Sequence, residues 1–394
     1  MTTRPIRVLQ VIDSLGMGGA ETWLMEVLRF WYKTGAVQMD FLATGGKPGI
    51  FDEQARRLGA RIHYAKYGRA SVAGFAKQFR RILRDGKYDA IHDHQDYVSG
   101  WHFLIGASEL PRIRITHVHN PSYQILNNYG VSASRRLTGR IGKALVARYS
   151  THITGTSRQV ITEYGFDEPS FRNIPKAALH CGFQSERFIG ERNVAKASVC
   201  AEFGWPSDSK IILFVGRIDR SADPSDSQNH KNSAFGVSVA LEAGRREPRV
   251  RMLLVGALSP AVPILQQRIA HTGLGERIRF AGVRKDVEQL MLGSNVLLFP
   301  SRGEGLGMVA VEAQAAGLPV LASDRVPREC VVVPELVCFQ RVEAGEAVWA
   351  SELLDIMERQ QNAENANERV AASAFSIENS AQALSRLYTA GALA

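Results

Sequence analysis

The sequence lacks the features that mark several large classes of protein. It has no apolar run of the roughly 20 residues needed to cross a bilayer, and residues 1–13 show no signal-peptide pattern. Its four cysteines lie far apart, without CxxC spacing, so we expect reduced and mostly buried thiols. These absences argue against a membrane-spanning or secreted protein and against a zinc ribbon. We therefore expect a cytosolic protein.

The net charge of +9 comes without a recognisable nucleic-acid motif, and the basic residues are not interleaved with exposed aromatics. We therefore predict no nucleic-acid partner. An anionic membrane surface, or a site built for phosphates, explains the charge more simply. A chance bias in composition stays open as the third explanation.

The chain of 394 residues is too long for one ordinary core, so its length predicts two domains. Alternating strand and helix patterns predict a doubly wound parallel sheet in each half of the sequence. Residues 174–192 are predicted to connect the two domains. The predicted strands are 6–12, 37–42, 61–64, 88–92, 113–117, 151–154, 210–215, 251–255, 278–280 and 296–299, one starting at 320, and last sheet material at 325–334 and 337–339. The predicted helices include 20–31, 71–85, 97–106, 234–242, 263–271, 308–316, 346–363 and 377–390.

The stretch 295–320 carries the strongest functional signal. It predicts a strand, a loop with three glycines, a helix and a second strand, and ligands of open α/β sheets bind where strands end. Glu304 lies in the loop and Glu312 lies just past the first turn of the helix. Backbone amides at a helix start bind anions, and carboxylates accept hydrogen bonds from hydroxyls. A nucleotide sugar offers both groups, although turn chemistry and helix capping alone would also account for the pattern.

Glu304, Glu312 and the following run EAQAAGLPVLASD together resemble the signature of the retaining glycosyltransferases of family 4. Within that family the chain is most similar to the capsule and exopolysaccharide branch, and the resemblance covers nearly the whole chain. It implies the GT-B fold, in which two Rossmann-like domains face each other across a cleft. Residues 1–185 would form the acceptor domain and residues 193–375 the nucleotide-sugar domain, with the C-terminal helix 377–394 packing back on the first domain.

A glycine-rich loop follows the first predicted strand. Gly16, Gly18 and Gly19 do not have the GxGxxG spacing of a dinucleotide site, so a tight turn is one explanation. Close approach to a diphosphate is the other. The segment DSLGMGGAE resembles the first loop of the family, which implies that Gly18 and Gly19 contact the diphosphate of the sugar donor.

Two histidine pairs end predicted strands, His92 with His94 and His117 with His119. Alternate residues of a strand share a face, so a metal site is possible, but no further ligands complete it. Structural or solvated histidines are the commoner explanation. The resemblance of ITHVHNPS to a family loop implies that His119, or His117 if the register differs by two, contacts the transferred sugar near the reacting centre.

Two cations lie in the loop after the strand at 210–215, which we expect to be polar and mobile over 218–230. A lone Arg or Lys in a loop is usually solvated. The resemblance instead implies that Arg217 and Lys231 bind the diphosphate of the sugar donor and stabilise the leaving group.

The resemblance implies the remaining contacts to the nucleotide sugar. Glu312 would hold the ribose hydroxyls, and Glu304 would contact the sugar. Other contacts would come from Gly305, Leu306 and Gly307 in the same loop and from Val283 and Arg284 on the nucleobase side.

A basic helix is predicted over 124–148. Helical spacing puts Arg136, Arg140 and Lys143 on one face. A solvated surface and an electropositive patch that meets anionic lipid both fit this pattern.

Together with the resemblance, these features predict a glycosyltransferase that moves a sugar from a nucleotide sugar, with UDP as the expected nucleotide, to a lipid-linked or polysaccharide acceptor. The resemblance implies that the reaction retains the anomeric configuration. No metal-binding carboxylate cluster presents itself, so we expect metal-independent activity without a cofactor. An enzyme of the same fold with a soluble acceptor is the near alternative. A non-catalytic nucleotide-sugar-binding component of an assembly complex is the alternative from another class.

Overall fold

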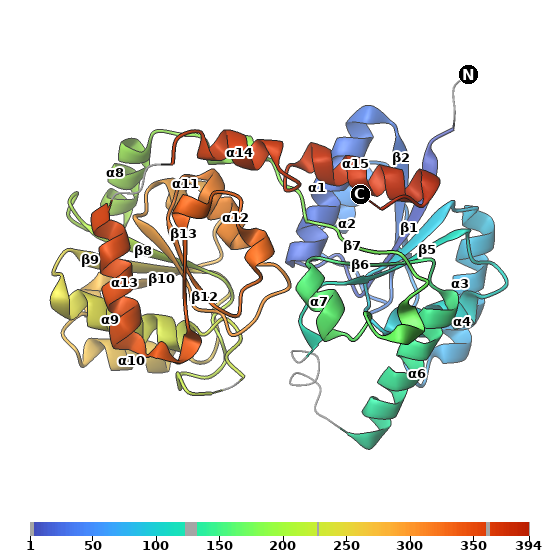
Figure 1. Ribbon diagram of the computed structural model, residues 1–394, viewed down its shortest axis with the longest axis horizontal. Coiled ribbons are helices and arrows are strands. Elements are labelled where there is room, and N and C mark those ends of the chain that lie inside the picture. The colour runs from blue at the N-terminus through green and yellow to red at the C-terminus, as the bar shows by residue number, and fades with distance from the viewer. Residues whose placement is uncertain (1–3, 123–131, 227, 360–362, 394) are drawn as a thin grey trace. The chain divides into compact units, whose positions relative to one another are not determined.

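The computed structural model describes residues 4–122, 132–226, 228–359 and 363–393. The chain forms two compact units (Figure 1). Unit 1 comprises Met1–Phe183 and Ala374–Ala394, and unit 2 comprises Gln184–Ser373. Among the described helices, none is both long enough and apolar enough to cross a membrane.

Unit 1 is built on a sheet of seven parallel strands in the order β3-β2-β1-β4-β5-β6-β7. The strands are β1 (Ile6–Ile12), β2 (Val37–Ala43), β3 (Ile62–Tyr64), β4 (Ala90–Asp93), β5 (Ile113–Val118), β6 (His152–Gly155) and β7 (Lys176–Ala178). Their helices are α1 (Gly19–Thr34), α2 (Asp52–Arg57), α3 (Val72–Gly86), α4 (Val98–Gly106), α6 (Ala133–Tyr149), α7 (Arg158–Glu163) and α15 (Ile377–Ala390).

The core of unit 1 forms because its strands carry apolar residues that helices cover. Phe75, Phe79 and Phe103 pack from α3 and α4 on Leu9 and Ile91 of the central strands. The last helix, α15, contacts both α1 and β1 although it is far from them in sequence (Figure 1). The C-terminus of the chain is therefore part of the first unit's packing.

Unit 2 repeats the design with six parallel strands in the order β10-β9-β8-β11-β12-β13. The strands are β8 (Lys210–Val215), β9 (Val250–Val255), β10 (Ile278–Gly282), β11 (Val296–Phe299), β12 (Val320–Ser323) and β13 (Val337–Gln340). The helices are α8 (Arg192–Phe203), α9 (Ser233–Arg246), α10 (Val262–Ala270), α11 (Val287–Leu292), α12 (Met308–Ala315), α13 (Glu346–Arg359) and α14 (Ala366–Ala372). All four residues of β11 are buried, as expected for a central strand covered on both faces.

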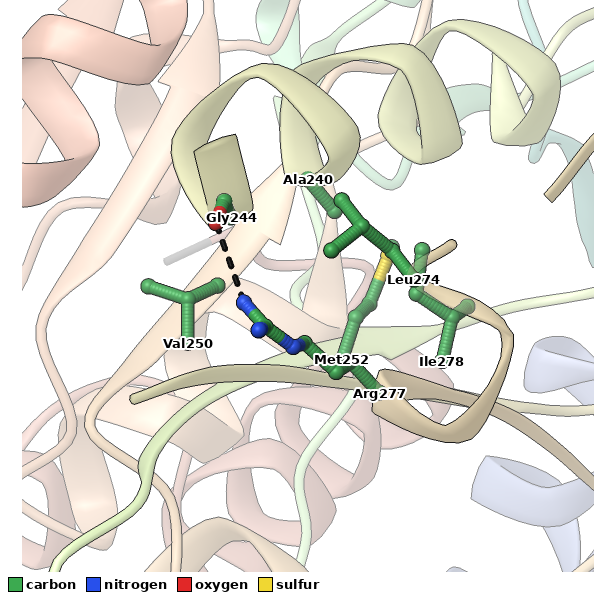
Figure 2. Close-up of a pocket in the computed structure, with 7 residues that line it drawn as sticks. All are labelled: Ala240, Gly244, Val250, Met252, Leu274, Arg277 and Ile278. Atoms are coloured by element: carbon green, nitrogen blue, oxygen red, sulfur yellow. Dashed lines mark hydrogen bonds between the residues drawn. The ribbon is translucent and has the colours of Figure 1, made fainter. Parts of the chain in front are cut away.

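A small pocket in unit 2 lies between α9 and the beginnings of β9 and β10 (Figure 2). Its lining is mostly apolar, and the guanidinium of Arg277 donates a hydrogen bond of 3.1 Å to the Gly244 carbonyl. The empty space is about 180 Å³, below the roughly 300 Å³ at which small-molecule sites begin. This pocket is at the amino ends of the strands, whereas ligands of open α/β sheets bind at the carboxyl ends, so it is not the expected ligand site.

The prediction of two doubly wound parallel sheets is confirmed, and three local predictions need correction. The segment 174–192 is not only a connection, because Lys176–Ala178 pairs with β6 as an edge strand. Residues 325–334 form no strand: the Gln314 side chain accepts from the backbone N–H groups of Val332 and Val333 (both 2.8 Å). Helix α8 was not predicted. In the predicted helix 124–148, residues 124–131 lie outside the described residues, and α6 covers the rest.

Candidate functional site

The strand order of unit 2 reverses between β8 and β11, and such a switch point is where open α/β sheets bind ligands. Arg217 follows β8, and the loop 300–307 follows β11. The parallel sheet thus brings the ends of two distant segments of the sequence to the same edge.

Lys231 and Glu304 meet at this edge. The Lys231 ammonium lies 2.7 Å from Glu304 Oε1, and both side chains are largely withdrawn from solvent. The ammonium also lies 5.9 Å from the centre of the Phe299 ring. The pair therefore holds a cation and an acid in contact beside the end of β11.

Asp219 organises the loop that carries Lys231, and the sequence did not identify it as a site residue. Its buried carboxylate accepts hydrogen bonds from the backbone N–H groups of Lys231 (3.1 Å) and Ser233 (2.9 Å). The Ser233 hydroxyl donates a third at 3.2 Å. The signal in the sequence was an acid two residues past Arg217, with a serine opening the next helix. Such a carboxylate satisfies N–H groups that the start of α9 leaves unpaired.

Side-chain hydrogen bonds connect parts of the loop between β8 and α9, within the residues that the structure describes. The Asn229 amide donates to the carbonyls of Ser221 (3.2 Å) and Asp223 (2.7 Å). Arg217 is exposed, and its guanidinium forms no hydrogen bond or ion pair with any residue that the structure describes. The first predicted cation is thus open to solvent and the second is paired with Glu304.

Glu312 lies in α12 and is half-buried. Burial raises the pKa of its carboxyl to about 7, an effect that nearby Arg187 opposes and Glu288 reinforces. Arg187 is itself paired with Glu288 at 3.0 Å. Within the described ranges, no side chain donates a hydrogen bond to the Glu312 carboxyl. Its oxygens are therefore available to hydroxyl groups of a ligand.

Glycine brings the backbone close at this edge. Gly307 begins α12 with φ +94°, and a Cβ there would lie 2.9 Å from the Phe299 ring. A Cβ at Gly256, at the end of β9, would lie 2.1 Å from the Gly216 carbonyl oxygen. Gly305 and Leu306 are buried in the same loop. Side chains larger than hydrogen would separate these segments.

The predicted nucleobase contacts follow β10, the outer strand on that side. The Val283 side chain is 57% exposed. The Arg284 guanidinium is bound by Asp286 (2.7 and 2.8 Å) and by Glu202 of α8, and these carboxylates raise its pKa. The structure therefore engages the Arg284 side chain with acids of unit 2 and leaves the Val283 side chain open.

In unit 1 the strand order reverses between β1 and β4, so the glycine-rich loop again follows a switch-point strand. Gly19 opens α1, and Gly18 precedes it. A Cβ at Gly18 would lie 2.2 Å from a Glu21 carboxylate oxygen, whereas Gly19 faces open space. The first loop also packs against a second one, because a Cβ at Gly49 would lie 2.3 Å from the Leu15 carbonyl oxygen.

The two histidine pairs form one cluster at the ends of β4 and β5. His92 Nε2 lies 3.0 Å from His117 Nδ1, and His94 Nδ1 lies 2.7 Å from His119 Nε2. The rings of His117 and His119 stack with centres 4.2 Å apart and planes 10° apart. His117 is fully buried and His119 is partly exposed, so of these two only His119 can meet a ligand without rearrangement.

His92, His94 and His117 offer nitrogen atoms within 4.8 Å of one another, which is the only spacing that suggests a metal site among the described residues. The hydrogen bonds of the cluster offer another explanation for the spacing. Both ring nitrogens of His92 and both of His94 already have hydrogen-bond partners, so they would have to give these up to bind an ion. Hydrogen-bonded neutral imidazoles therefore fit the geometry better.

The histidine cluster predicts that acid weakens the fold. Burial lowers the pKa of His92, His94 and His117 well below 6.5 and that of His119 to about 4. The unfolded chain takes up these protons near pH 6.5, so the free energy of unfolding should fall as pH falls below about 6.5. Each histidine contributes a slope of up to about 1.4 kcal/mol per pH unit.

Urea unfolding at several pH values between 7.5 and 5 measures this slope. His117→Gln should reduce it by about one histidine's share relative to the unsubstituted protein, whatever the variant does to absolute stability. Equal slopes for the two proteins would contradict the assignment of a neutral buried His117.

Comparison with known proteins agrees with this geometry. The family model "Glycosyltransferase Family 4" matches residues 17–170, and "Glycosyl transferases group 1" matches residues 209–356. The chain is 27% identical over 352 residues to EpsF of Bacillus subtilis (strain 168), a protein named as a glycosyltransferase, covering 89% of this chain and 87% of EpsF. It is 24% identical over 328 residues to the capsular polysaccharide biosynthesis glycosyltransferase CapH of Staphylococcus aureus, with 81% of each covered.

Among solved structures, HepE of Anabaena in complex with UDP and glucose superposes with a TM-score of 0.75 and 17% sequence identity. The match covers 98% of this chain and all of HepE, and it establishes the shared fold. Each half of the chain thus matches a glycosyltransferase domain, and the two parallel sheets match the GT-B architecture. The protein is a glycosyltransferase of the GT-B fold, with a Glycosyltransferase Family 4 domain in its first half and a glycosyl transferases group 1 domain in its second.

Proposed function

We propose that this protein is a retaining glycosyltransferase that moves a sugar from UDP to a lipid-linked or polysaccharide acceptor in capsule or exopolysaccharide synthesis. The observation that carries the proposal is the charge arrangement at the switch point of unit 2. Arg217, Lys231, Glu304 and Glu312 lie on segments that leave the strand ends there. The names of EpsF and CapH, and the UDP bound in HepE, support the choice of substrate class.

In this proposal the two cations of unit 2 bind the diphosphate. Arg217 is free to approach a phosphate, and Lys231 exchanges part of its contact with Glu304 for a phosphate oxygen. Each hydrogen bond to a charged group contributes about 1.5–3 kcal/mol. The interaction strengthens as negative charge grows on the leaving UDP, so it lowers the barrier as well as the dissociation constant.

Two carboxylates bind the hydroxyl groups of the nucleotide sugar: Glu312 those of the ribose, and Glu304 those of the transferred sugar. The Glu312 carboxyl is half-buried and accepts no hydrogen bond within the described residues, and two ribose hydroxyls would supply the missing donors. Binding of hydroxyl donors would favour the ionised form and lower the raised pKa of Glu312. Glu304, released in part from Lys231, would accept from a hydroxyl of the transferred sugar. Val283, Gly18 and Gly19 are proposed to line the nucleotide and diphosphate, as the resemblance implies.

The retaining reaction proceeds on one face of the sugar. The bond from the anomeric carbon to the UDP oxygen breaks, and the acceptor oxygen forms its bond from the same side. The acceptor proton passes to the departing phosphate oxygen, so no protein carboxylate is needed as a base. Arg217 and Lys231 supply the positive charge, and we propose that the reaction needs no metal. Activity that EDTA abolishes and manganese restores would contradict that part of the proposal.

The roles of Arg217 and Lys231 predict a specific loss. Arg217→Ala and Lys231→Ala should each lower kcat/KM for the UDP-sugar by about ten- to a hundredfold or more, because each removes a charged hydrogen bond that strengthens in the transition state. Arg220→Ala is the matched control: Arg220 is an exposed arginine three residues along the same loop, and its removal should change kcat/KM by less than twofold. The kcat/KM of all three variants is measured as the transfer of radiolabelled sugar from a UDP-sugar to a membrane extract.

If the Arg217→Ala and Lys231→Ala variants were as active as the unsubstituted protein, diphosphate binding at the switch point of unit 2 would be excluded. Product analysis in the same assay identifies a soluble acceptor, if the label stays in the aqueous phase.

Helix α6 supports a peripheral contact with an anionic membrane at the inner face of the cell membrane. Leu137 and Ile141 lie one turn apart and expose 59% and 40% of their surface. Arg136 and Arg140 precede them along the helix and are exposed too. Apolar side chains between cations on one helix surface suit the boundary between headgroups and acyl chains. This contact would bring the enzyme to a lipid-linked acceptor.

Sedimentation with liposomes tests the contact. The protein should pellet with vesicles that contain anionic lipid and stay in solution with neutral ones, and high salt should release it. Replacing Leu137 and Ile141 by Ser should reduce the bound fraction severalfold. Replacing Val194 and Ile264 by Ser, which removes apolar side chains of α8 and α10 that are at least as exposed, should not. Equal binding of both double variants would contradict a role for α6.

A further inference from the structure

A continuous chain of hydrogen bonds runs through the interior of unit 1 and ends at His119. The links are His119 Nε2 to His94 Nδ1 (2.7 Å), His94 Nε2 to Gln10 Oε1 (2.8 Å), Gln10 Nε2 to Tyr388 Oη (3.0 Å), Tyr388 Oη to His92 Nδ1 (2.7 Å) and His92 Nε2 to His117 Nδ1 (3.0 Å). β1, β4, β5 and α15 all contribute to it. Gln10, His92, His117 and Tyr388 are almost completely excluded from solvent.

Gln10 determines which atom donates and which accepts in each hydrogen bond of this network. The oxygen of a carboxamide only accepts hydrogen bonds and its nitrogen only donates them. His94 must therefore donate from Nε2 to the Gln10 oxygen. A neutral imidazole carries one proton, so His94 Nδ1 bears a lone pair and accepts. The proton in the next link must then come from His119 Nε2.

The donor role of the Gln10 nitrogen fixes the direction of the remaining hydrogen bonds in the network. Tyr388 accepts from the Gln10 nitrogen, so its own proton goes to His92 Nδ1. His92 then donates from Nε2 to His117 Nδ1, and the proton of His117 is on Nε2. That nitrogen is buried and has no hydrogen-bond partner among the residues described. The chain therefore ends internally at an N–H group, and at its other end His119 is left with an unprotonated Nδ1.

The four histidines of this hydrogen-bond network are neutral at physiological pH. Burial and the neighbouring imidazoles lower the pKa of His92, His94 and His117 well below the usual value, and burial lowers the pKa of His119 to about 4. Trp23 restrains the rings: its centre lies 5.7 Å from that of His117 and 6.4 Å from that of His119. Its indole N–H is in turn held by the Ser380 hydroxyl of α15 at 2.9 Å.

We propose that Gln10, His94 and Tyr388 are positioning residues, which hold His119 in the tautomer with its proton on Nε2 and so make Nδ1 a hydrogen-bond acceptor for a substrate hydroxyl. The assignment of a sugar hydroxyl rests on the proposed function, whereas the tautomer does not. A hydroxyl can donate to Nδ1, but a carboxylate at the same place would meet a lone pair and lose a hydrogen bond. His119 therefore favours a hydroxyl over an acidic group at the position that it contacts.

NMR of the full ¹⁵N-labelled protein without substrate tests the tautomer directly. Long-range proton–nitrogen correlations distinguish protonated from bare imidazole nitrogens, and assignment uses single histidine substitutions. We expect His119 and His94 to carry their protons on Nε2. Two other histidines of unit 1 serve as internal references. His102 must carry a proton on Nδ1, which faces Asp93 Oδ2 at 2.7 Å, and His152 on Nε2, which faces the Gly391 carbonyl at 2.8 Å.

A proton on His119 Nδ1, with both references as expected, would overturn the proposal. This result would not bear on sugar transfer. Conversely, a protein that transfers no sugar but shows the expected tautomers would overturn the proposed function and leave the hydrogen-bond chain intact.

Kinetics test the positioning role. His94→Phe keeps a ring of similar size but removes the acceptor for His119, so His119 should populate both tautomers and kcat/KM should fall in proportion to the fraction of molecules that lose the Nε2 proton, about two- to threefold. Gln10→Leu should mix the tautomers of His94 and His119 in the same spectrum while leaving the His102 signals unchanged. A folded His94→Phe in which His119 keeps the Nε2-protonated tautomer alone, or whose kcat/KM is unchanged although the tautomers are mixed, would overturn the role.

Discussion

The contact between Lys231 and Glu304, 2.7 Å apart beside the end of β11, is the interaction on which the account of function depends. Two residues 73 positions apart in sequence meet because β8 and β11 are neighbours in a parallel sheet. Their loops leave the same edge at the point where the strand order reverses. A sheet with another strand order would separate the cation from the acid.

The Lys231–Glu304 pair contributes little to the stability of the fold. Removing two charges from water costs about as much as their attraction returns, and apolar residues of similar size would often serve the fold better. A ligand changes that balance, because a diphosphate offers Lys231 a second anion and a sugar offers Glu304 hydroxyl donors. Glu312 shows the same tension: burial raises the pKa of its carboxyl to about 7, and no described residue donates to it. Both features suit a site that binds phosphate and hydroxyl groups better than they suit a purely structural role.

Unit 1 meets the problem of buried polar groups differently. Its histidines are hydrogen-bonded to one another, to Gln10 and to Tyr388, so the cluster stays neutral and most of its nitrogens are paired in a fixed order. Helix α15 closes this network from the far end of the sequence. One unit thus presents charge at its switch point and the other presents an ordered set of neutral imidazoles.

Much of the architecture could be predicted from the sequence because many of the strands, such as β8 and β11, are short apolar runs bounded by polar residues or glycine. The run at β11 is apolar and buried at every position. Predictions failed where side chains replaced the expected backbone pairing, as Gln314 does for Val332 and Val333, and where a short strand such as β7 has only three residues. The candidate site residues were predicted from their places after strands and from the family resemblance, and the structure brings two of them, Lys231 and Glu304, into contact. Asp219, Gln10 and Tyr388 were missed because their roles depend on contacts between segments that only the fold brings together.

The most direct test of the central claim is a crystal structure of the protein with UDP. The diphosphate should bind Arg217 and Lys231 at the switch point of unit 2, with the ribose hydroxyls donating to Glu312. UDP bound in unit 1, or on unit 2 away from Glu312 and Arg217, would contradict the proposed donor site.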